Sequence, residues 1–249
     1  MLKEERHAQI LKMINRYHKV LSSELSEELD VSEDTIRRDL KELSDMGHIK
    51  KVHGGAMLNP LNPFTYKERE VYAHEHKLTI ADKAQPLLQD GNVVIMDGGT
   101  TNLQFVKTLP KNLKATIFTN SLPIAVELSG HPTIEVMFLG GKVLKSAQVT
   151  IGIDIIEALE RIKADLCFLG TRSMDVDSGI TEIDWEEAQV KRTIINGATK
   201  VVCLLISEKI NTTNPYLVCN LQKVSTIVTE LSPEDELLKP YAKAGIDII

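Results

Sequence analysis

Apolar residues in the first 57 positions recur at helical spacing and predict three short amphipathic helices. The second helix is expected to begin at Ser22 or Ser23 and the third at Ser32, because serine hydroxyls cap helix N-termini well. The third helix is expected to continue to about Asp45, with Gly47 following as a stop. The apolar sides consist of Ile10, Leu11 and Ile14, then Leu25 and Leu29, then Ile36, Leu40 and Leu43.

The third helix has a polar side that suits DNA. A tight turn, LDVS, precedes it, and this order is typical of a helix-turn-helix. Basic and hydroxyl side chains can bond phosphates and base edges in the major groove. The outward residues are Thr35, Arg37, Arg38 and Lys41, and an extended stretch follows with Lys50, Lys51 and His53, turned by Gly54 and Gly55. We interpret that stretch as a two-stranded wing. For the third helix, a solvated charged helix on a small bundle is an alternative, because it would have a similar distribution of apolar and charged residues around its axis.

From residue 91 onward, short apolar runs alternate with helical stretches. Continuous apolar strands are typical of a parallel sheet covered on both faces, so the pattern predicts a Rossmann-like α/β domain. The runs are 93–96, 115–118, 134–139, 166–169, 201–206 and 226–228. Pro60 and Pro63 indicate a linker between the two parts. The predicted division is a DNA-binding domain over 1–57, a linker over 58–74 and an α/β domain over 75–249.

The sequence DGGTTN at 97–102 is the main chemical feature of the second part. It follows the run VVIM and precedes a helical segment, so backbone N–H groups and a helix N-terminus are expected to meet at an anion site. It lacks the lysine of a Walker A motif. Further polar clusters follow other strands at 119–121, 140–142, 170–172 and 207–209, where ligands of open α/β sheets bind. Taken singly, each cluster is also explained as a helix cap or a surface turn.

Residues 31–56, VSEDTIRRDLKELSDMGHIKKVHGGA, closely resemble the helix-turn-helix of the DeoR family of bacterial transcriptional regulators. Arg6 also matches an early arginine of that family, whereas Tyr17-His18-Lys19 stands where many members have a glycine. The resemblance implies a winged helix-turn-helix that binds double-stranded operator DNA. Together with the helical wheel, it assigns DNA contacts to Ser32, Thr35, Arg37, Arg38, Lys41, Lys51, His53 and Gly54.

The second part is similar to the same family over nearly its whole length, which implies a fold similar to ribose-5-phosphate isomerase and a phosphorylated sugar effector. By this resemblance the effector-binding residues are Asp97, Gly98, Gly99, Thr100, Thr101, Asn120, Lys142, Asp175, Glu187, Lys191 and Lys209. Two segments depart from the family pattern. Gly170-Thr171-Arg172-Ser173-Met174 replaces Gly-Ala-x-Gly-Ile, and Ile206-Ser207-Glu208-Lys209 replaces Asp-Ser-Ser-Lys. Arg172 is either a specificity residue or a surface arginine.

Composition limits the class of protein. A net charge of −6 leaves room only for a local basic surface, and neither a signal peptide nor a membrane-spanning run is evident, so we expect a cytoplasmic protein. Cys167, Cys203 and Cys219 form no C-x-x-C pair and are expected to be reduced, mostly buried thiols. His74-Glu75-His76 lacks H-E-x-x-H spacing and is expected at the surface. No cofactor and no metal are expected.

These features predict a regulator, most simply a repressor, of carbohydrate metabolism genes that acts as a homo-oligomer, a dimer or tetramer. Membrane association and catalysis are not expected. One alternative is a sugar-phosphate isomerase-like enzyme carrying a DNA-binding head, for which Asp175, Asp177, Glu187 and Lys191 offer acid–base groups. Another is a DNA-binding head with a second domain that serves only oligomerisation.

Overall fold

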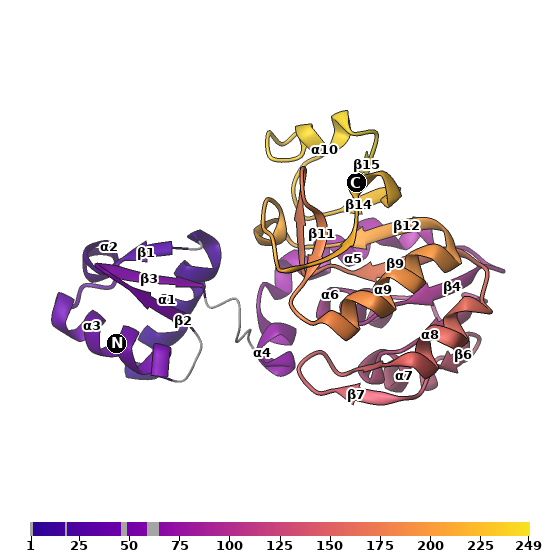
Figure 1. Ribbon diagram of the computed structural model, residues 1–249, viewed down its shortest axis with the longest axis horizontal. Helices are drawn as coiled ribbons and strands as arrows, with labels where there is room; N and C mark the ends of the chain where they lie inside the picture. Colours follow the sequence, from indigo (N-terminus) through magenta and orange to yellow (C-terminus); the bar gives the residue numbers. More distant parts are fainter. Residues whose placement is uncertain (1, 18, 46–48, 59–64) are drawn as a thin grey trace. The chain divides into compact units, whose positions relative to one another are not determined.

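The computed structural model describes residues 2–17, 19–45, 49–58 and 65–249 (Figure 1). The chain divides into two compact units, Met1–Phe64 and Thr65–Ile249, here called the head and the sensor unit. Pro60 and Pro63 of the expected linker, Gly47 and His18 lie outside the described residues. The sensor unit begins at Thr65, so residues 65–74 are not linker. The reason is a short helix, α4 (Tyr66–Val71), whose Tyr66 is buried in the core of that unit.

The head is a winged helix-turn-helix. Its helices pack around the apolar residues that the sequence pattern selects, with Ile10, Leu25, Ile36 and Leu40 fully buried. Strands β2 and β3 form the expected wing, and β1, which was not predicted, joins β3 to give a three-stranded antiparallel sheet in the order β1-β3-β2. The elements are α1 (Lys3–Tyr17), β1 (Lys19–Leu21), α2 (Ser22–Glu28), α3 (Glu33–Asp45), β2 (Ile49–Val52) and β3 (Gly55–Leu58).

Helix starts in the head agree with the sequence in one case and differ in the other. Ser32 caps α3, and its Oγ accepts a hydrogen bond of 3.3 Å from the Thr35 N–H. The expected cap of α2 at Ser22 or Ser23 is wrong, because Leu21 is the N-cap residue. The carboxylate of Glu24 reaches back to the Leu21 N–H at 3.0 Å and takes over the capping that a serine would supply.

The sensor unit is built on a seven-stranded parallel sheet in the order β15-β14-β12-β9-β4-β5-β6 (Figure 1). All six apolar runs identified in the sequence form strands of this sheet, which confirms the Rossmann-like prediction. The C-terminal strand β15 was not predicted. The strands are β4 (Val93–Met96), β5 (Thr116–Thr119), β6 (Glu135–Phe138), β9 (Ala164–Gly170), β12 (Ala198–Leu204), β14 (Thr226–Val228) and β15 (Asp247–Ile248).

Burial on both faces explains why the inner strands lack alternation, whereas β6 at the edge of the sheet is largely exposed. In β4, Ile95 joins the hydrophobic core on one face, whereas Val94 and Met96 join the core on the other. Helices α8 and α9 supply apolar side chains to the first core, and α5, α6 and α7 supply them to the second. These helices are α5 (His74–Ala84), α6 (Thr100–Lys107), α7 (Leu122–Ser129), α8 (Ile153–Glu160) and α9 (Trp185–Gly197).

Smaller elements, none of them predicted, sit around the sheet. A hairpin joins β7 and β8, and a separate antiparallel sheet has the order β10-β11-β13. Cys167 and Cys203 are buried in the first core, and Cys219 is half-buried. The described residues include no helix long and apolar enough to cross a membrane. The remaining elements are β7 (Lys142–Leu144), β8 (Val149–Ile151), β10 (Ser173–Asp175), β11 (Gly179–Glu182), β13 (Tyr216–Cys219), α10 (Lys239–Lys243) and the 3₁₀ turns η1 (Gln85–Leu87), η2 (Ser207–Lys209) and η3 (Leu221–Lys223).

Candidate DNA-binding surface and effector site

Helix α3 presents the candidate DNA-contacting residues outward. Ser32, Arg37, Arg38 and Lys41 are exposed, and Thr35 is half-exposed. The Ser32 and Thr35 hydroxyls lie 2.9 Å apart at the start of the helix. This arrangement places hydroxyl and cationic groups, together with the exposed acids Glu33 and Asp34, on the N-terminal part of α3, which recognition helices place against base edges.

Arg37 and Arg38 differ in their surroundings. Arg37 donates to Glu33 at 2.7 Å and to Asp34 at 3.3 Å, so its charge is partly balanced within the first turn of α3. Arg38 is exposed and lies on the next position of the helix. Of the two, Arg38 therefore presents the less compensated positive charge.

A buried ion pair fixes α3 to α1. The guanidinium of Arg6 donates to both oxygens of Asp39, at 2.6 and 3.1 Å, and His7 Nε2 lies 3.1 Å from the same carboxylate. Burial raises the pKa of Asp39, but the hydrogen bonds from Arg6 and His7 outweigh it and the pKa is lowered overall. The two matches to the family pattern at Arg6 and Asp39 thus have a structural role, which is to set the angle of α3.

The wing carries Lys51 and His53 on its exposed surface. Gly54 adopts a φ of 79° and forms its turn, which only glycine does without strain. A Cβ at Gly55 would lie 2.0 Å from the Val20 carbonyl, so this position needs glycine for the close approach of β3 to β1.

In the sensor unit, the loops that follow β4 and β9 meet where the strand order reverses. From this pair the chain runs outward through β5 and β6 on one side and through β12 and β14 on the other. The Gly170 N–H donates to Asp97 Oδ2 at 2.9 Å, and Asn102 Nδ2 donates to the carbonyls of Asp97 at 2.9 Å and Phe168 at 3.1 Å. A Cβ at Gly170 would lie 1.9 Å from the Gly98 carbonyl. The contact fixes the switch point, where open α/β sheets bind ligands.

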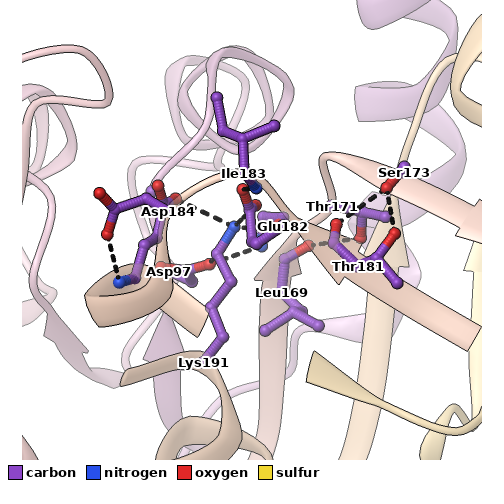
Figure 2. Close-up of polar contacts among 12 residues, drawn as sticks. Asp97, Leu169, Thr171, Ser173, Thr181, Glu182, Ile183, Asp184 and Lys191 are labelled. Atoms are coloured by element: carbon purple, nitrogen blue, oxygen red, sulfur yellow. Dashed lines mark hydrogen bonds and ion pairs between the residues drawn. The ribbon is translucent and has the colours of Figure 1, made fainter. Parts of the chain in front are cut away.

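Lys191 lies at the centre of a cluster of carboxylates at this point (Figure 2). Its ammonium donates to Glu182 and to the Gly170 carbonyl at 2.6 Å. It lies 3.1 Å from Glu187 Oε1 and 3.8 Å from Asp97 Oδ2. We call Asp97, Glu182, Glu187 and Lys191 the acidic cluster.

The acidic cluster carries more negative than positive groups in a buried place. Burial raises the pKa of Asp97 to about 7, while Lys191 opposes that shift. Burial and Glu187 raise the pKa of Glu182. Burial alone would lower the pKa of Lys191, but the three carboxylates outweigh it and raise that pKa above the ordinary value. Lys191 therefore keeps its proton and cannot act as a base at neutral pH.

Buried polar atoms without a hydrogen-bond partner gather around the same loops. Within the described residues there are five such side-chain atoms, whereas most buried polar groups in proteins are hydrogen-bonded. Asn102 lies at the start of α6, Asn120 and Ser121 follow the adjacent strand β5, and Glu208 precedes Lys209. The atoms are Tyr66 Oη, Asn102 Oδ1, Asn120 Oδ1, Ser121 Oγ and Glu208 Oε2.

The structure brings most of the predicted effector residues together. Gly99, with a φ of 126°, is the N-cap of α6, and Thr100 and Thr101 form its first turn. Asn120 lies beside this loop and ties β5 to β8 by donating to the Thr150 carbonyl at 3.1 Å. Lys209 donates to the Thr171 carbonyl at 2.6 Å, just beyond Gly170. Asp97, Gly98, Glu187 and Lys191 complete the group, as described above.

Two predicted residues have other surroundings. Lys142 is exposed on β7 and pairs with Glu186 at 2.6 Å. Asp175 accepts hydrogen bonds from the N–H groups of Asp177 at 3.1 Å and Ser178 at 2.9 Å, and thereby shapes the turn between β10 and β11. Both positions are explained by local structure.

The sequence did not predict Arg69, Lys77 and Glu182 as site residues, and it left open whether Arg172 is a specificity residue or a surface arginine. Glu182 ends a fully buried strand, and Lys77 is 3% exposed inside an amphipathic helix. Arg69 lies on α4, within the segment expected to be linker. No short motif marks these residues, since they reach the site only through the packing of α4, α5 and β11.

One group of side chains in the described residues has metal-ligand character. His76, Glu208 and Glu230 place possible ligand atoms within 4.8 Å of one another. His76 Nδ1 lies 3.4 Å from Glu230, and Glu230 already accepts from the Ser207 N–H at 3.1 Å and the Thr229 hydroxyl at 2.9 Å. These contacts explain why the three side chains lie together without a metal: His76 contacts Glu230, and Glu230 caps the 3₁₀ turn η2. His74, Glu75 and His76 are exposed.

Comparison with known proteins gives matches along both units. Residues 6–60 match the family model of the DeoR-like helix-turn-helix domain, and residues 72–231 match that of the DeoR C terminal sensor domain. The HTH-type transcriptional regulator GolR of Listeria innocua is 32% identical, over 98% of this chain and 97% of that protein. The HTH-type transcriptional repressor GlcR of Bacillus subtilis is 30% identical, over 100% of this chain and 96% of that protein.

Among solved structures, eIF2B beta from Chaetomium thermophilum is similar with a TM-score of 0.49 and 14% identity, over 68% of this chain and 53% of that chain. Ribose 5-phosphate isomerase A from Methanocaldococcus jannaschii is similar with a TM-score of 0.39 and 18% identity, over 55% of this chain and 54% of that chain.

Proposed function

The chain belongs to the DeoR family of helix-turn-helix transcriptional regulators, and from this premise we propose that it is a repressor whose operator affinity is controlled by a phosphorylated sugar. The relatives it matches are named as transcriptional regulators and repressors.

The arrangement of charge at the β4–β9 switch point is the observation that carries the effector proposal. Backbone N–H groups and hydroxyls of the loop at 98–101 lie at the start of α6, which favours a phosphate group. Glu187 of the acidic cluster, whose side chain is 13% exposed, supplies acceptors for sugar hydroxyls. One small region thus offers complementary partners to both halves of a sugar phosphate.

DNA recognition is assigned to the outward face of α3 and to the wing. Helix α3 enters the major groove, where Thr35, Arg38 and Lys41 face base edges and phosphates. Lys51 and His53 contact the adjacent backbone. A dimer or tetramer places two heads on paired half-sites, and the effector shifts the equilibrium by binding one arrangement more tightly than the other.

The isomerase-like alternative loses one of its acid–base groups. Lys191 is held protonated by three carboxylates, so it is not available as a general base. Incubation of the purified protein with ribose 5-phosphate and with glucosamine 6-phosphate is expected to give no product. Turnover of either compound would restore the alternative.

A panel of sugar phosphates and their unphosphorylated parents tests the proposal. We expect one phosphorylated compound to stabilise the full-length protein in a thermal-shift assay, by about 2.7 kcal/mol at 100 times its Kd, and to change operator affinity. The unphosphorylated parent should do neither. Failure of every phosphorylated compound on the panel would contradict the proposal.

Thr100→Asp tests the position of the phosphate. A carboxylate at the start of α6 should repel the anion and abolish the response to the effector. Thr199→Asp introduces the same charge at an exposed position at the beginning of β12, the opposite end of the sheet, and should leave the response intact. An unaltered response in Thr100→Asp would show that the phosphate binds elsewhere.

A further inference from the structure

Four cationic side chains from separate segments gather beside the effector site. Lys209 of η2 donates to the Thr171 carbonyl at 2.6 Å, immediately before Arg172. Lys77 of α5 donates to the carbonyls of Arg69 and, at 2.6 Å, of Tyr72. The Tyr72 hydroxyl in turn lies 3.4 Å from Glu208 Oε1, which joins the end of α4 to η2. We call Arg69, Lys77, Arg172 and Lys209 the cation cluster.

These cations repel one another, and each is at least partly buried. Burial and the charge of Arg172 lower the pKa of Arg69, while Glu187 and Glu182 act against that shift. Burial also lowers the pKa of Lys209 to about 7, with contributions from Arg172, Lys77 and Arg69. Glu182 and Glu187 favour the charged form of Arg172, but both carboxylates are in contact with Lys191. A bound anion would offset the repulsion that remains.

The position of α4 is held by specific contacts. Arg69 donates to the Ser146 carbonyl at 2.8 Å, in the turn between β7 and β8, and its guanidinium lies 5.6 Å from the centre of the Tyr66 ring. Ala73, between α4 and α5, adopts a φ of 49°, a left-handed conformation that costs a non-glycine residue energy. Lys77 bridges this strained junction by binding the last carbonyls of α4. Strained backbone persists where the surrounding contacts hold it, as Lys77 does here.

We propose that Arg69, Arg172 and Lys209 bind the anionic group of the effector together with the loop at 98–101, which adjoins Gly170, so that α4 is itself part of the effector site. This deepens the proposed function and rests on it in one respect, namely that the effector is a phosphorylated compound. Arg172 occupies the variable position of the family's Gly-Ala-x-Gly-Ile pattern, and Arg69 comes from a helix outside the sheet. Two arginines allow bidentate recognition of phosphate, which a lysine does not provide.

The location of α4 gives this site a regulatory consequence. α4 is the first helix of the sensor unit after residues 59–64, so the chain enters that unit through it. An anion bound by Arg69 stabilises one position of α4 relative to the sheet. Effector binding therefore fixes the element at which the head is attached.

Inorganic phosphate is the probe for the site itself. Its affinity for the full-length protein is measured by titration at constant ionic strength, following the melting temperature. We expect Arg69→Ala and Arg172→Ala each to weaken phosphate binding at least tenfold. Lys67→Ala, an exposed position on the same helix, and Arg161→Ala, exposed at the end of α8, remove the same charge and should bind phosphate like the parent protein. The controls also cancel the general stabilisation that phosphate salts give.

Arg69→Lys and Arg172→Lys keep the charge and serve if an alanine variant fails to fold. Loss of the bidentate fork should leave them with intermediate affinity. Affinity equal to the parent in both Arg69 variants would remove α4 from the site, and equal affinity in both Arg172 variants would overturn the cluster as the anion site.

The same variants separate this proposal from the proposed function. If inorganic phosphate binds through Arg69 and Arg172 but no sugar phosphate changes operator affinity, the anion site stands and the regulatory function fails. If a sugar phosphate changes operator affinity equally in the parent and in all Arg69 and Arg172 variants, the function stands and the cation cluster is not its site.

Discussion

Arg37 and Arg38 show that neighbouring identical residues differ in their availability for DNA. The carboxylates of Glu33 and Asp34 hold Arg37 in the first turn of α3, whereas Arg38 is exposed. A DNA phosphate must compete with two acids for Arg37. This distinction is not visible in the motif, which lists both arginines alike.

Arg38→Ala should therefore weaken specific operator binding by about 1–3 kcal/mol, and Arg37→Ala by less. Fluorescence anisotropy of the two full-length variants, with an operator selected from random DNA, measures both values. Effector affinity should stay unchanged in each. Equal losses in the two variants would show that the ion pairs of α3 open at no cost.

Lys209 shows how a residue's position sets its charge. Burial and the surrounding charges of Arg172, Lys77, Arg69 and Lys191 lower its pKa to about 7, so much of the lysine is neutral above that pH. A bound anion favours the protonated form and raises the pKa again. Binding above pH 7 must therefore take up a proton.

Effector affinity should consequently fall by up to tenfold per pH unit between about pH 7.5 and 9. A phosphate monoester, with its second pKa near 6, is already a dianion throughout this range and does not contribute. Calorimetric titration with the effector measures the slope. Lys209→Arg keeps its charge and should flatten the profile; a parent profile already flat would contradict the role of Lys209.

At the level of elements, the head depends on one buried ion pair and the sensor unit on close contacts between strand ends. Arg6 and Asp39 join α1 to α3 by two hydrogen bonds of 2.6 and 3.1 Å. Gly98 and Gly170 bring the ends of β4 and β9 into backbone contact. In both cases a close contact between distant segments positions an element proposed to take part in recognition.

Arg6→Ala should lower the unfolding free energy of the head by about 2 kcal/mol, because it leaves the buried Asp39 carboxylate without its two hydrogen bonds from Arg6. Operator affinity should fall as well, since α3 loses its attachment to α1. Chemical denaturation followed by circular dichroism measures the stability. Lys3→Ala, which removes an exposed ion pair with Glu42, is the matched control and should have little effect.

At the scale of the whole molecule, the proposed DNA-binding surface and the proposed effector site belong to separate units of the same chain. Communication between them requires that the effector bind two arrangements of the protein with different affinity. Such coupling is reciprocal: DNA must change effector affinity by the same factor by which the effector changes DNA affinity.

We expect this factor to be about 5–150, measured as the ratio of effector Kd values with and without saturating operator. Arg69→Ala should bring the ratio close to one if α4 transmits the signal. The same ratio obtained from operator Kd values with and without effector provides an independent check. An effector Kd that is identical with and without operator in the parent protein would contradict control of DNA binding by the effector.

The sequence by itself determined the local and periodic features. Apolar runs predicted six of the seven strands of the parallel sheet, and helical spacing predicted the core of the head, because each pattern depends on residues close together in the chain. The glycine loop at 98–99 and the cap at Ser32 were equally evident, since turn and cap chemistry is local.

Tertiary structure decided which polar residues meet. Glu182, Arg172, Lys77 and Arg69 come from different segments and reach the site through the packing of β11, the end of β9, α5 and α4. Lys142 follows a strand in the same way as the other candidates, yet it pairs with Glu186 on the exterior. Spacing along the chain gives no information on contacts between such distant segments, because they depend on how the whole core packs.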